Sequence, residues 1–141
     1  MTTTAPTFGN PSYGLTRQLG QVDFAAARAA VQQALAGQGF GVLTEIDVQA
    51  TMKKKLDVDV APYVILGACN PSLAHQALSA EPAIGLLLPC NVVVAQTDTG
   101  VAVSAIDPTK QFEVVGRPEI APLAEQVRDK LAAALEAVTV S

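Results

Sequence analysis

The chain has 141 residues, of which half are hydrophobic and 16% are charged, and its formal net charge at pH 7 is -4. A chain of this length can bury a core without disulfides or metals, and its aliphatic composition excludes a disordered protein. The net negative charge and the lack of tryptophan argue against a nucleic-acid partner, which would need basic and aromatic side chains on one face.

The beginning of the chain, MTTTAPTFGN, lacks the basic start and the apolar stretch of a signal peptide. We therefore expect a flexible tail over residues 1–10, a single domain over 11–141 and a cytoplasmic protein. The longest apolar runs, Val64 to Cys69 and Ile84 to Cys90, are far shorter than the roughly 20 residues of a membrane span. No membrane partner is expected, and in a reducing compartment the two cysteines should be free thiols.

The first third of the chain predicts a strand, a helix and a second strand. The first strand is expected over Tyr13 to Leu19, and Asp23 is placed to cap the helix that follows. Apolar residues then recur at helical spacing, and glycines end the pattern. These apolar residues are Phe24, Ala27, Val31 and Leu35, and the glycines are Gly37 and Gly39. The second strand is expected over Phe40 to Val48, with Val42, Ile46 and Val48 on one face.

The middle of the chain predicts a buried strand between two short helices. A basic helix is expected over Ala50 to Leu56, and the all-apolar run Pro62 to Ala68 is typical of a central strand that is buried on both faces. Asn70 then caps a helix that has Pro71 at its first position, where a missing N–H costs nothing. That helix should end by the Glu81-Pro82 step.

The last part predicts a hairpin and a long helix. Strands are expected over Leu86 to Ala95 and Val101 to Ile106, joined by a polar connection that contains Gly100. Apolar residues at three- and four-residue steps then predict a C-terminal helix over Ile120 to Val138, which must pack on the sheet.

This order of elements predicts an α+β fold, in which two longer helices cover one face of a mainly antiparallel sheet in two layers. Short helices are inserted between the strands. A ferredoxin-like split sheet is the alternative topology. Because either architecture hosts many unrelated functions, the fold does not decide the chemistry.

The only two cysteines each stand directly before an asparagine, in Cys69-Asn70-Pro71 and Cys90-Asn91. A thiol just before a helix start lies near unpaired N–H groups and the positive end of the helix dipole, which favours the thiolate. We therefore expect Cys69, Asn70, Cys90 and Asn91 to lie together as a small-ligand site. The competing interpretation is structural, with the cysteines buried in the core and the asparagines capping a helix or a bulge.

His75 lies about one turn into the helix that follows Cys69. Cys69, Cys90 and His75 would form a soft metal-ligand set. The alternative is a thiol-dependent redox protein or enzyme, with Cys69 as nucleophile, Cys90 as resolving thiol and His75 as base. A solvated or structurally satisfied histidine is the simpler interpretation of His75.

The common signatures of catalysis are absent from the sequence. There is no CxxC, HExxH, GxSxG or phosphate loop, so no reaction and no cofactor follows from the motifs.

Glu45 and Asp47 lie on one face of the second strand, where an acid/base pair is conceivable, but a solvated strand face is the favoured interpretation.

Several segments together resemble the uncharacterised family named domain of unknown function 302. The segments are Gly39-Phe40-Gly41-Val42, Glu45-Ile46-Asp47-Val48, Gly67-Ala68-Cys69-Asn70-Pro71, Ala74, Ala77-Leu78 and Leu88-Pro89-Cys90-Asn91-Val92-Val93-Val94. The likeness runs from about Phe24 to Pro108. It implies a compact β-α-β(4)-α domain of the TATA-binding-protein-like type that tends to self-associate, and it implies no established activity.

From the resemblance and the high apolar fraction we expect a homodimer. The favoured function is a self-associating binding domain with a small-ligand or metal site near Cys69 and Cys90.

Overall fold

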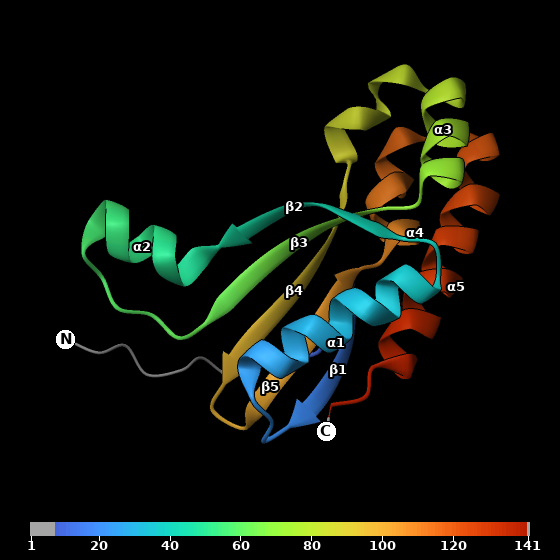
Figure 1. Cartoon of the computed structure of the whole chain (residues 1–141). Coiled ribbons are helices and arrows are strands. Elements are labelled where there is room, and N and C mark those ends of the chain that lie inside the picture. Colours follow the sequence, from blue (N-terminus) through green and yellow to red (C-terminus); the bar gives the residue numbers. More distant parts are fainter. Residues whose placement is uncertain (1–7, 141) are drawn as a thin grey trace.

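The computed structural model of the protein describes residues 8–140 (Figure 1). Of the expected N-terminal tail, residues 1–7 lie outside the described part, and residues 8–10 have no helix or strand.

One antiparallel sheet of five strands forms the centre of the structure, in the spatial order β1-β5-β4-β3-β2 (Figure 1). The strands are β1 (Gly14–Gly20), β2 (Gly41–Asp47), β3 (Tyr63–Cys69), β4 (Cys90–Thr97) and β5 (Gly100–Ile106). Strands β2 to β5 follow one another as a meander, and β1 joins the free edge of β5. This connectivity excludes the ferredoxin-like alternative.

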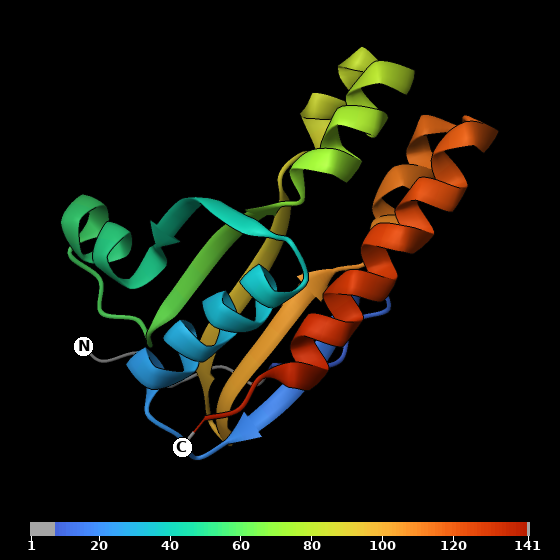
Figure 2. The same ribbon diagram turned by 45° about the vertical axis from the view of Figure 1, so that its right-hand side comes forward.

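Two long helices, α1 (Phe24–Gly37) and α5 (Ala121–Ala137), lie side by side on the same face of the sheet (Figure 2). The prediction of a two-layer α+β fold is therefore confirmed. The remaining helices are α2 (Val48–Leu56), α3 (Pro71–Ala80) and α4 (Pro108–Gln111), and three 3-10 turns are η1 (Pro82–Leu87), η2 (Phe112–Val115) and η3 (Pro118–Ile120). No helix within residues 8–140 is long and apolar enough to cross a membrane.

The core lies between the sheet and the helices α1 and α5. On this face, side chains from three strands and both helices are completely buried, because each apolar helix stripe packs against an apolar sheet face. The fully buried residues include Val31, Leu35, Leu66, Val92, Val94, Val103 and Leu131. We call this side of the sheet the helix-covered face and the opposite side the open face.

Capping interactions fix the ends of the two long helices. The Ala26 N–H donates to Asp23 Oδ2 at 2.9 Å, as the sequence predicts for the start of α1. At the end of α5, Arg17 Nη1 of β1 donates to the carbonyl oxygens of Leu135 at 2.6 Å and Val138 at 2.8 Å. A cation is favourable there because the last carbonyls of a helix carry partial negative charge.

The prediction for the second strand is wrong in two respects: where the strand ends, and which of its apolar residues share a face of the sheet. Val48 begins α2 instead of ending the strand, because Asp47 Oδ1 accepts the Ala50 N–H at 2.9 Å and caps that helix. The pairing of β2 with β3 also shifts between Val42 and Thr44. An extra residue in one strand reverses the alternation, so Val42 lies on the helix-covered face and Ile46 on the open face.

Two further expectations differ from the structure. The strand predicted over Leu86 to Ala95 begins at Cys90, because the preceding residues form the turn η1. The run Pro62 to Ala68 forms β3 next to the central strand β4, but it is not buried on both faces, since the long helices cover only one. Ile65 on the open face is half-buried.

Beyond one end of the sheet, α3, η1, α4, η2, η3 and the first turns of α5 project as a group, which we call the helical end (Figure 2). Residues of α3 contact η1, η3 and α5 there. Both cavities described below lie at or next to this end.

Candidate functional site

The structure brings the two Cys-Asn motifs to the same end of the sheet. Ala68 pairs with Cys90 across β3 and β4, so Cys69 lies one residue beyond that pair. Both cysteines line a cavity of about 30 Å³, whose other walls come largely from apolar side chains of α3 and α5 such as Leu73 and Leu123. That volume holds about one water molecule, and an apolar cavity of this kind stays dry.

The two cysteines line the same cavity but belong to positions of opposite orientation in the strand alternation. Successive side chains of a strand alternate, so Ala68 and Cys90 face the covered core while Cys69 follows the open face. Both cysteines are free, with Cys90 buried and Cys69 partly exposed.

Burial also separates the chemistry of the two thiols. Desolvation by burial, with a smaller electrostatic contribution from nearby Cys69, raises the pKa of Cys90 to about 11. Cys90 therefore stays protonated at neutral pH and is a poor nucleophile, since the thiolate is the reactive form.

The asparagines that follow the cysteines do not share a site. Asn70 Oδ1 accepts the Leu73 N–H at 3.3 Å as the cap of α3, and Asn70 Nδ2 donates to the Gln38 carbonyl at 3.3 Å. The Asn70 amide thus joins the start of α3 to the turn after α1. Asn91 is exposed on the open face, where its backbone pairs with Gly67.

His75 is exposed on α3, on the side away from the buried residues Leu73 and Ala77. It does not line the cavity at the cysteines. Within residues 8–140 no group of three His, Cys, Asp or Glu side chains is placed to hold a metal ion.

The carboxylates of β2 have structural partners. Glu45 lies 3.2 Å from Arg28 Nη2 and also accepts a hydrogen bond from Gln32, both on α1. Asp47 caps α2. Both carboxylates thus have hydrogen-bond or ion-pair partners within the fold, which favours the structural interpretation over an acid/base pair.

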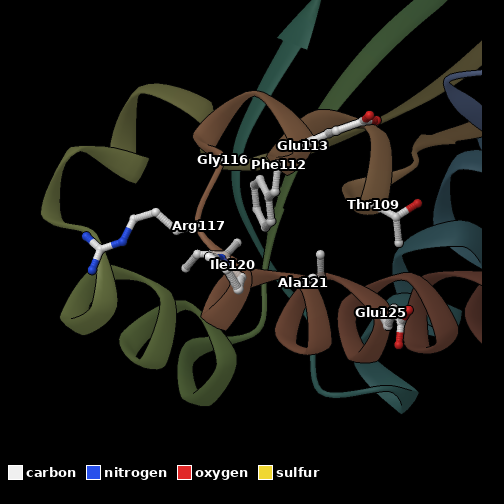
Figure 3. A pocket seen from close by; sticks show the side chains of 10 residues that line it. Thr109, Phe112, Glu113, Gly116, Arg117, Ile120, Ala121 and Glu125 are labelled. Carbon is white, nitrogen blue, oxygen red and sulfur yellow. The ribbon is translucent and has the colours of Figure 1, made fainter.

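A larger cavity lies at the helical end, between η2 and the first turns of α5 (Figure 3). This groove has a volume of about 360 Å³. Its floor is apolar and its rim carries charged side chains. The floor includes Phe112, Ile120 and Ala124, and the rim includes Glu113, Arg117 and Glu125. Phe112 also lines the cavity at the cysteines and therefore separates the two spaces.

Sequence reasoning missed this groove. Apart from the start of α5, its walls come from α4, η2 and η3, which are three or four residues long. Elements of one turn show no hydrophobic periodicity, so the pattern between Asp107 and Ile120 carries no signal of a helix or strand. The only local hint is the turn chemistry of Gly116 and Pro118, and Gly116 adopts φ +70°.

The family model described as "Domain of unknown function DUF302" matches residues 15–138. The chain belongs to this family. The crystal structure of an uncharacterised conserved DUF302 protein from Bacillus stearothermophilus is similar over 92% of this chain and 100% of that chain, with 26% identity and a TM-score of 0.84. A comparison with curated proteins gives no match. The resemblance seen in the Cys-Asn motifs is thus confirmed, and the DUF302 match extends through the whole of α5.

Proposed function

We propose that this DUF302 protein is a non-catalytic binding domain that self-associates through the open face of its sheet. The observation that supports the proposal is the composition of this face. Strands β3, β4 and β5 contain no Asp, Glu, Lys or Arg at all. Of the charged side chains of β1 and β2, Arg17 and Glu45 turn toward α5 and α1 on the helix-covered face, and Asp47 caps α2.

The open face has the arrangement of an interface between proteins. Half-buried Ile65 and Val93 lie near its middle, and the exposed Thr44 and Asn91 lie toward its margin. Interfaces are depleted in charge at the centre and polar at the rim. In a chain of net charge -4, an uncharged face is also the side on which two copies approach with least repulsion.

The area of the face is sufficient for a specific dimer. Strands about 4.8 Å apart, with residues rising about 3.3 Å, give a sheet of this size a flat area on the order of 500 Å². Two copies would bury on the order of 1,000 Å² together, which is about the least area expected of a biological interface.

The test is the substitution Val93→Lys, which places a charge at the middle of the open face. We expect wild type to have the mass of a dimer by light scattering at micromolar concentration, and Val93→Lys to have that of a monomer. The matched control is Gln33→Lys on the exposed side of α1, which adds the same charge and should remain dimeric. A monomeric wild type, or a dimeric Val93→Lys protein, contradicts the proposal.

A thiol-dependent redox role is the second candidate, and the partial exposure of Cys69 beside the capped start of α3 favours it. The same geometry speaks against Cys90 as the resolving thiol, because it is buried and turned to the other face. It also speaks against His75 as the base, because His75 lies on the outer side of α3.

A further inference from the structure

We infer that the groove beside Phe112 binds a small organic cation, a protonated amine attached to an apolar or aromatic body. The inference concerns a single copy of the chain and does not depend on self-association. It combines the shape of the groove, its apolar floor and the arrangement of charge on its rim.

The floor of the groove is a fixed apolar surface. Phe112, Ile120 and Ala124 are 5%, 1% and 2% exposed, so the core of the helical end holds them in place. Figure 3 shows the Phe112 ring and the Ile120 side chain pointing toward one another from η2 and from the end of η3. A volume of about 360 Å³ is in the range of small-molecule sites, and it accommodates one aromatic ring with a short chain.

Two carboxylates flank the groove without a cation of their own. Glu113 on η2 and Glu125 on α5 are exposed, and neither forms a side-chain hydrogen bond or an ion pair within residues 8–140. Both lie toward the Thr109 side of the groove in Figure 3. The Thr109 hydroxyl donates to Asp107 Oδ1 at 2.6 Å, so its oxygen remains able to accept a hydrogen bond from an ammonium group.

The one positive charge on the rim is already compensated. Arg117 Nη2 lies 2.7 Å from Glu119 Oε1, and Arg117 Nη1 lies 3.4 Å from Glu81 Oε2. In Figure 3 the guanidinium extends away from Phe112 and Ile120. The groove thus presents net negative charge beside an apolar floor, which selects a cation over an anion.

The experiment uses three probes of one shape: the cation phenethylammonium, the neutral 2-phenylethanol and the anion phenylacetate. Each is titrated into the full-length protein and followed by the NMR shifts of backbone amides. We expect the cation to bind and to shift amides of residues 112–125. The alcohol should bind about five- to tenfold more weakly, because it lacks the attraction of two surface carboxylates. Phenylacetate should not bind.

Three variants locate the site. The double variant Glu113→Gln with Glu125→Gln should bind the cation about five- to tenfold more weakly than wild type, with the affinity that wild type has for the alcohol. Glu136→Gln, which removes an exposed carboxylate at the other end of α5, should leave the affinity unchanged. Ala121→Trp fills the groove from an exposed position in the first turn of α5 and should abolish binding of both probes while the melting temperature is kept.

Equal affinity for the cation and the alcohol would overturn the proposal that the groove prefers a positively charged ligand. Binding that survives Ala121→Trp would overturn the location, and an absence of binding at millimolar phenethylammonium would overturn the site itself. Because the groove lies in one copy, the titration on monomeric Val93→Lys protein should give the same result as on wild type. A failure of self-association is thus distinguishable from a failure of the site.

Discussion

The two faces of the sheet have similar sequences and very different surroundings. On the helix-covered face Leu66 and Val92 are fully buried, whereas their neighbours Ile65 and Val93 on the open face are only half-buried. The central strands lack charge on both faces. Within one copy the open face buries small residues such as Ala95 and Ala102, but the larger Ile65 and Val93 stay partly exposed there. An occupant of the open face would explain these two. The following experiments separate the two faces.

The largest difference should come from a charge placed on each face. Leu131→Asp buries a carboxylate at a fully buried position of α5, and we expect it to lower the free energy of unfolding by about 4 kcal/mol. Ile46→Asp on the open face, where the side chain is 48% exposed, should lower it by less than about 1 kcal/mol. Urea denaturation in the monomeric Val93→Lys background measures both without the contribution of association. Equal losses would mean that both faces are buried.

The cysteines should report the same difference through their reactivity. In native protein at neutral pH, iodoacetamide should modify Cys69 and leave Cys90 intact, because Cys90 is buried and protonated. Mass spectrometry of the digested protein identifies the labelled residue. Labelling of Cys90 at the rate of Cys69 would show that the covered face opens readily.

Cys90 should also make stability depend on pH in the alkaline range. Burial raises its pKa from the ordinary 9.0 to about 11 in the folded protein, so its contribution to stability is complete below pH 9 and is lost as the pH rises toward 11. The loss over this window should be about 2 to 3 kcal/mol. Urea denaturation of wild type and Cys90→Ala at pH 8 and pH 11 isolates the contribution of Cys90. An identical pH dependence of stability in the two proteins would contradict the prediction.

A smaller effect on stability should distinguish two glycines of the paired strands β2 and β3, Gly41 and Gly67, which lie near the Cys-Asn motifs. A Cβ at Gly67 would meet Thr44 Oγ1 and would lie 2.7 Å from the Pro89 ring, whereas a Cβ at Gly41 would have no neighbour within 4 Å. We expect Gly67→Ala to lower the free energy of unfolding by about 1 to 2 kcal/mol, and Gly41→Ala to leave it nearly unchanged. Thermal unfolding of the two variants side by side measures the difference. A neutral Gly67→Ala would mean that Thr44 and Pro89 move apart without cost.

The sequence predicted the fold where local chemistry and periodicity agree. Asp23 and Asn70 cap the helices expected of them, and the apolar stripe that contains Leu131 forms α5. The prediction failed where the spacing changes. The irregular pairing after Val42 reverses the faces of β2. The apolar run of β3 predicts a buried strand, but it does not tell which elements of the fold cover each face of that strand.

The candidate site was less predictable than the fold. The Cys-Asn motifs meet as the connection between β3 and β4 suggests, yet strand alternation separates the two thiols, and the helical period turns His75 outward. The groove depends on Phe112 and on the residues of three single turns. Their positions are set by tertiary packing, and no repeat in the sequence encodes them.

The contact of Arg17 with the end of α5 also has a consequence for the order of folding. It joins residues more than a hundred positions apart, with a separation of 118 between Arg17 and Leu135, and β1 itself pairs with β5. During synthesis β1 emerges early and must wait for β5 and then for α5 before its side chains find their partners. Contacts of such long range slow folding. Strand β1 should therefore be the last to gain protection from hydrogen exchange, after the β2–β5 meander has formed.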